Sequence, residues 1–217
     1  MKKILVTALM VILLTPLSAH AFDWGNFFRW LFLSSETVST KTKEVSDYSS
    51  VASDIRKDAK STDEDLAKVL LRIIPNISVQ KDATTFESRI NTVSTGNKTE
   101  SEKSTQLAQI VSDYATSVQN NKLAVIVTMK TLSSSDKKDL ADNITSLAKC
   151  SQKYTELAQK AYNQANDLQR YTAQSDEQIK VLNEINNLNT ELKNKSNALQ
   201  NLTTTLKLFG KLSGLEF

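Results

Sequence analysis

Hydrophobic side chains recur at alternating steps of four and three residues through most of the chain, which predicts long α-helices packed side by side. Between residues 136 and 209 this spacing forms two successive seams, and no Gly or Pro interrupts them. A period of 3.5 residues keeps one stripe of a helix against a partner helix. The first seam is Leu140, Ile144, Leu147, Ser151, Tyr154, Ala158, Ala161, Ala165 and Leu168; the second is Val181, Ile185, Leu188, Leu192, Lys195, Leu199, Leu202, Leu206 and Phe209.

The stretch 136–209 has two interpretations. The first seam continues in phase through Thr172 and Ser175 to Ile179 and Leu182, which favours one very long C-terminal helix. The alternative is a hairpin near residue 174, because Ser175 and Gln178 have the spacing of a capping box that starts a new helix. A hairpin would give segments that match the two earlier helical regions in length, as in a four-helix bundle.

Residues 36–74 carry the same spacing and predict another helix. Ser61 and Glu64 form a further capping-box pattern, so a fresh helix is expected to begin there, with a kink. Pro75 is expected to end it, because the residue before a proline disfavours helical geometry.

Residues 76–98 are expected to form a linker with a short helix, in which Phe86, Ile90 and Val93 share one face. Gly96 is expected to stop this helix in a left-handed conformation. The capping box at 99–102 then predicts a helix that runs to about Leu132. Its stretch 123–127, Leu-Ala-Val-Ile-Val, is apolar on all sides, which predicts a central buried helix; a tip that inserts into a membrane is the alternative.

Four Gly and two Pro are too few for a fold with many turns, so the fold class predicted is all-α. We expect an elongated antiparallel helical bundle or coiled coil, with the very long C-terminal helix or the hairpin described above. The expected organisation is a signal peptide at 1–21, an aromatic segment at 22–33, the helical domain at 34–209 and a flexible tail at 210–217.

The first 21 residues have the pattern of a signal peptide. Lys2 and Lys3 precede an apolar stretch at 4–14, and Ala19 and Ala21 occupy the small-residue positions of a cleavage site. The protein is therefore expected to be exported, to the periplasm or out of the cell. Cleavage would leave 25 basic and 24 acidic side chains, spread along the helices, so nucleic-acid binding is not expected.

The aromatic segment 22–33 holds both tryptophans and four of the seven phenylalanines of the chain. Large aromatic side chains are stabilised by burial, so something is expected to cover them. The segment is interpreted as a cap on the bundle, as an anchor at a membrane interface or as a contact with another protein. The candidates for membrane or partner contact are Phe22, Trp24, Phe27, Phe28, Trp30, Leu31 and Phe32.

The single histidine, His20, lies in the signal peptide, so the mature chain would lack histidine altogether. This excludes catalytic triads with a histidine base and metal sites with histidine ligands. No glycine-rich phosphate loop is present. The acidic clusters at 63–65, 136–139 and 176–177 all fall where helices are expected to start, and there carboxylates complement the helix dipole. No catalytic residue, cofactor or metal site is predicted.

Two single residues stand out. Cys150, the only cysteine, beside the first seam, is expected to be a partly buried thiol, with an intermolecular disulfide as the alternative. Lys195 interrupts the second seam: it either fixes the register or the oligomeric state, or extends its alkyl chain so that the ammonium reaches water, which is the favoured interpretation.

The function predicted is that of an exported, non-enzymatic structural or interaction protein of the bacterial envelope or extracellular space. Its long helical faces would bind a protein partner or a second copy of the chain. One alternative is a membrane-active protein, like helical pore-forming toxins, that inserts through its aromatic segment. The other is a hydrolase that uses two carboxylates.

Overall fold

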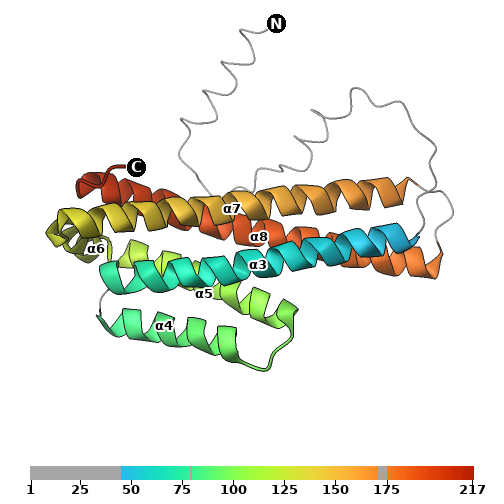
Figure 1. The fold of residues 1–217 in the computed structure, drawn as a ribbon, viewed down its shortest axis with the longest axis horizontal. Helices are drawn as coiled ribbons and strands as arrows, with labels where there is room; N and C mark the ends of the chain where they lie inside the picture. Colours follow the sequence, from blue (N-terminus) through green and yellow to red (C-terminus); the bar gives the residue numbers. More distant parts are fainter. Residues whose placement is uncertain (1–44, 79, 171–174) are drawn as a thin grey trace, which may run out of the picture. The chain divides into compact units, whose positions relative to one another are not determined.

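The computed structural model describes residues 45–78, 80–170 and 175–217, which belong to one compact unit, Lys43–Phe217 (Figure 1). Six α-helices and no strands occur within these ranges, so the predicted all-α helical bundle is confirmed. The helices are α3 (Val45–Ile77), α4 (Gln80–Thr95), α5 (Glu100–Asn120), α6 (Lys122–Thr131), α7 (Ser134–Gln169) and α8 (Asp176–Leu212).

The C-terminal region is an antiparallel hairpin of α7 and α8, so the favoured single long helix is wrong and the alternative is confirmed. The capping box at Ser175 starts α8: Gln178 donates its backbone N–H to the Ser175 hydroxyl, and its side chain accepts from the Ser175 N–H. Halfway along the hairpin, Ser151 and Ser196 each donate a side-chain hydrogen bond to the other's carbonyl at 3.1 Å. The capping box at Ser175 therefore marks the start of a new helix, although the hydrophobic spacing continues in phase through this position.

Both predicted seams form the core of the hairpin. Every position of the first seam from Leu140 to Leu168 is buried in α7, and every position of the second is buried in α8. Ile179, where the first seam was expected to continue, is instead 43% exposed, because a new helix begins at Asp176. α3 packs along α7, and α5 packs along α8. The 3.5-residue spacing thus identified the inward faces of both helices.

Helix α3 is continuous through the two places, Ser61 and Pro75, where the sequence predicted a fresh start and an end. It continues through Ser61 without a fresh start, and Asp63, two residues on, accepts a hydrogen bond from Lys195. Pro75 lies inside its last turn and α3 ends at Ile77. A proline removes one N–H donor there, and the side-chain amide of Asn76 bonds the nearby Arg72 carbonyl at 2.7 Å.

α4 and α5 form a second antiparallel pair beside α3 (Figure 1). The predicted face of Phe86, Ile90 and Val93 is buried, and the capping box at 99–102 is confirmed. Gly96 is not left-handed: Gly214 has the one positive φ among the described glycines. Glycine at position 96 instead avoids a steric clash, because a Cβ there would lie 2.8 Å from the Thr92 carbonyl oxygen.

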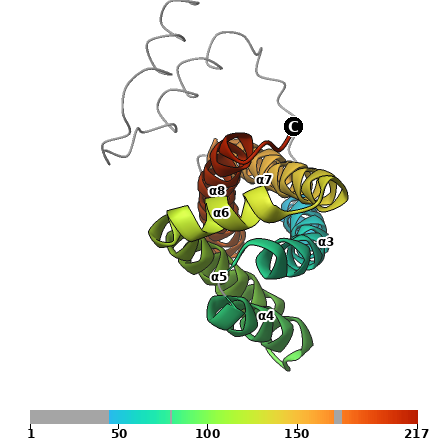
Figure 2. The same cartoon turned by 90° about the vertical axis from the view of Figure 1, so that its left-hand side faces the viewer.

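The helix expected to run from 99 to 132 is divided at Asn121, and its second part, α6, crosses the end of the bundle (Figure 2). α6 packs on α8 and α3. Val125 and Met129 face inward, whereas Leu123 and Val127 are 78% and 60% exposed. The central buried position predicted for 123–127 is therefore wrong, since a helix that crosses an end has an outer face.

The stretch 210–217, expected as a flexible tail, continues the fold. α8 extends to Leu212, and Gly214 at φ 80° turns the chain so that the Leu215 N–H bonds the Gly210 carbonyl at 2.9 Å. Leu215 is buried, and the Ser213 hydroxyl bonds the Ile126 carbonyl of α6 at 3.1 Å. The C-terminal end of α8 and α6 are thereby joined.

Candidate functional site

A polar cluster lies in the interior of the bundle, and we call it the ion cluster. It consists of Asp63 of α3, Ser104 of α5, Tyr154 of α7, and Glu191 and Lys195 of α8. The Lys195 side chain is only 1% exposed. Lys195 occupies a position of the second seam, so its side chain points inward together with its apolar neighbours. Its ammonium there lies beside residues of α3, α5 and α7.

Asp63 is the acceptor at the centre of the ion cluster. The Lys195 ammonium donates to its two carboxylate oxygens at 2.9 and 3.1 Å, and the Ser104 hydroxyl donates at 2.8 Å. Tyr154 also donates to Asp63, Ser104 accepts from Lys195, and Glu191 lies 3.5 Å from the ammonium. The favoured prediction that the Lys195 ammonium reaches water is wrong, because carboxylates beside it compensate the charge inside the protein.

The protonation state of Tyr154 follows from these contacts. Burial, together with the charge of Asp63, raises the pKa of Tyr154 far above its usual range, so the phenol keeps its proton and donates. The Lys195 side chain forms ion pairs with both Asp63 and Glu191. Lys195 donates to the Ser104 hydroxyl oxygen and does not accept its proton, so the pair lacks the arrangement of an activated nucleophile. The ion cluster connects four helices through hydrogen bonds.

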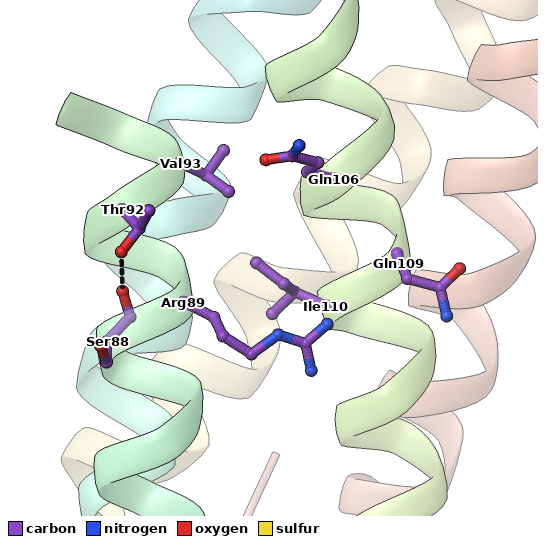
Figure 3. Close-up of a pocket in the computed structure, with 7 residues that line it drawn as sticks. All are labelled: Ser88, Arg89, Thr92, Val93, Gln106, Gln109 and Ile110. Atoms are coloured by element: carbon purple, nitrogen blue, oxygen red, sulfur yellow. Dashed lines mark hydrogen bonds between the residues drawn. The ribbon is translucent and has the colours of Figure 1, made fainter. Parts of the chain in front are cut away.

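A shallow cavity of about 250 Å³ lies between α4 and α5 (Figure 3). Arg89 extends from α4 toward Ile110 of α5, and its guanidinium donates to Asp113 at 2.6 Å. Burial opposes ionisation of Asp113, but hydrogen bonds from Arg89 and Gln109 and the charge of Arg89 outweigh it and lower its pKa. The most prominent charge in this cavity is therefore already paired.

Cys150 lies on α7 and is buried. Burial, followed by the charges of Asp65 and Asp63, raises the pKa of its thiol to about 11. The thiol is thus protonated at neutral pH, and the thiolate that disulfide exchange requires is scarce. The intermolecular disulfide stays a prediction.

Large exposed apolar side chains occur on α6 and on the C-terminal end of α8, two elements that pack against each other, and we call these side chains the end surface. Leu123 and Val127 are one helical turn apart on α6, and Leu208 and Leu212 are one turn apart on α8. The members are Leu123 (78% exposed), Val127 (60%), Leu208 (54%), Leu212 (54%) and Phe217 (46%). Among the described residues, the one further large hydrophobic that is exposed is Ile179, near the start of α8.

The predicted contact residues of the aromatic segment, at positions 22, 24, 27, 28 and 30–32, lie outside the described residues. The acidic pairs at 136–139 and 176–177 lie at the starts of α7 and α8 as predicted, whereas Asp63 and Asp65 lie inside α3. In the part of the chain that the structure describes, no helix is long and apolar enough to cross a membrane, and no metal-binding group of side chains is present.

Sequence reasoning missed both the partners of Lys195 and the end surface. The position of Lys195 in a hydrophobic seam indicated that it needs a partner, but the partner, Asp63, is 132 residues away in the chain. A short stretch that is apolar on all sides signalled the second. No protein family, no curated protein and no solved structure matches this chain.

Proposed function

We propose that this protein is an exported, non-enzymatic helical interaction protein of the bacterial envelope or extracellular space, and that it engages its partner through the end surface. The observation that carries the proposal is the exposure of Leu123 and Val127 on a helix whose other face buries Val125 and Met129. Export is supported by the pattern of residues 1–21.

The bundle interior supports an interaction role rather than a catalytic one. The charged groups of the ion cluster are paired with one another, and Arg89 is paired with Asp113. Side chains committed in this way hold helices together. Among the described residues, the exposed apolar area that a partner could cover lies mainly at the end surface instead.

The end surface can supply a moderate binding energy. Fully burying one Leu, Val or Phe side chain contributes about 1.5–3 kcal/mol, so covering five that are roughly half exposed would contribute on the order of 5 kcal/mol. Association entropy opposes this gain. The contact is therefore expected to be reversible unless charges strengthen it.

The experiment is site-specific photo-crosslinking in cells that export the full chain. A photoreactive amino acid replaces Leu123, and in a matched control it replaces Ile179, which is also exposed and apolar but lies near the start of α8. Adducts to a protein or to lipid are expected at position 123 and not at 179. Equal or absent adducts at the two positions would contradict the proposal.

A further inference from the structure

We propose that the occupant of the end surface is the surface of an anionic lipid bilayer. This inference rests on the proposed function, because it names the partner of the same surface. Three observations support it: the distribution of charge along the chain, the absence of salt bridges from the lysines of this region within the described residues, and the contacts of two of these lysines with aromatic rings.

The positive charge of the chain is concentrated around the end surface. Residues 122–139 and 207–217 contain six lysines and three carboxylates, whereas the rest of the predicted mature chain contains 19 basic and 21 acidic side chains. The six are Lys122, Lys130, Lys137, Lys138, Lys207 and Lys211. Basic residues beside an apolar surface attract anionic headgroups.

These lysines are available for an external anion. None of the six forms a salt bridge with a carboxylate of another described residue, whereas Lys195, Arg56 and Arg89 do. Lys122, Lys130, Lys138 and Lys211 are exposed.

Two of the lysines are held next to the apolar side chains. The Lys122 ammonium lies 5.9 Å from the centre of the Phe209 ring, and that of Lys207 lies 5.9 Å from the centre of the Phe217 ring. Lys122 directly precedes Leu123, and Lys207 directly precedes Leu208. Two ammonium groups thus lie on the same helices as the exposed apolar side chains and close to them in the chain, as expected where Leu and Val enter the acyl boundary and Lys meets the headgroups.

The test places an environment-sensitive fluorophore on the end surface of the full mature chain. Leu123→Cys carries the label, Ile179→Cys is the control, and both are made with Cys150→Ala so that one thiol reacts. Ile179 is a matched control because it lies about 50 Å along α8 from Leu212. Circular dichroism of each labelled variant checks that it is folded, and Leu212→Cys provides a second probe of the same surface.

Vesicles of phosphatidylcholine that contain phosphatidylglycerol are expected to shift the emission of the probe at position 123 to the blue and to brighten it. The probe at 179 is expected to change little, and vesicles of phosphatidylcholine alone are expected to give no response. Each replacement among Lys122→Gln, Lys130→Gln and Lys211→Gln should weaken apparent binding about fivefold. Added salt should weaken it in the same direction.

Three results would overturn the proposal. One is no response at 123 and 212 to anionic vesicles; another is an equal response at 179, which would mean that a different part of the chain binds the vesicles. The third is a probe at 123 that is already shielded without vesicles, by a second copy or by another part of the chain. Protein adducts at position 123 in cells, together with no response to lipid, would overturn the lipid assignment and leave the interaction role intact.

Discussion

Removing the carboxylate of Asp63 tests whether the ion cluster holds the bundle together. Asp63→Ala deletes the acceptor shared by Lys195, Tyr154 and Ser104. The Lys195 side chain is 1% exposed, so its ammonium is expected to stay inside the protein with Glu191, at 3.5 Å, as its remaining carboxylate.

The size of the effect follows from this geometry. Breaking a buried ion pair by removing one partner costs about 3–5 kcal/mol. The Glu191 contact and the 18% exposure of Asp63 reduce the loss, so Asp63→Ala is expected to lower the free energy of unfolding by about 3 kcal/mol. Lys195→Met should cost less, about 1–2 kcal/mol, because Asp63 keeps two hydroxyl donors and some contact with water.

Urea unfolding followed by far-ultraviolet circular dichroism measures these losses, and the double variant completes a mutant cycle. The double variant is expected to be less destabilised than the sum of the two single variants, because neither charge is then left alone. Additive losses, or a loss below about 1 kcal/mol for Asp63→Ala, would refute the assigned role of the ion cluster.

Three further predictions concern single residues. The pKa of Asp113 is lowered below 3.8, so its ionised form stabilises the fold above that pH and this contribution is lost as the pH falls through the lower folded value. Asp113→Asn should therefore make acid unfolding less steep than in the wild type, and an unchanged acid profile would contradict this. Cys150 should react with a thiol reagent far more slowly in the folded than in the urea-unfolded protein, because burial raises its pKa to about 11; equal rates would contradict its buried position. Gly96→Ala should lower the free energy of unfolding by about 1 kcal/mol, because its Cβ would meet the Thr92 carbonyl, whereas exposed Thr95→Ala should have a smaller effect.

Much of the fold could be predicted because helical packing leaves a periodic record in the sequence. Both seams of the hairpin and the inward face of α4 were predicted residue by residue. The break between α7 and α8 was harder, because a seam that continues in phase fits one helix as well as two. The Ser175 capping box carried the information that decided it.

The candidate sites could be predicted only in part, because they depend on contacts between distant segments. Lys195 was noticeable as a lysine in an apolar seam, but nothing local identifies Asp63 as its partner. The apolar stretch that contains Leu123 and Val127 fits a buried helix and a helix with an outer face equally well. Only the crossing of α6 over the end of the bundle determines which of its side chains face outward.

The end surface exists only if α8 returns beside α7 and brings its C-terminal end to α6. The most direct measurement of this central claim is the distance between spin labels placed at Lys138 and Lys211 in the folded protein. Packed helix axes lie about 8–10 Å apart, so the hairpin predicts a label separation within about 30 Å. One continuous helix would separate the labels by about 110 Å, and that result would contradict the account.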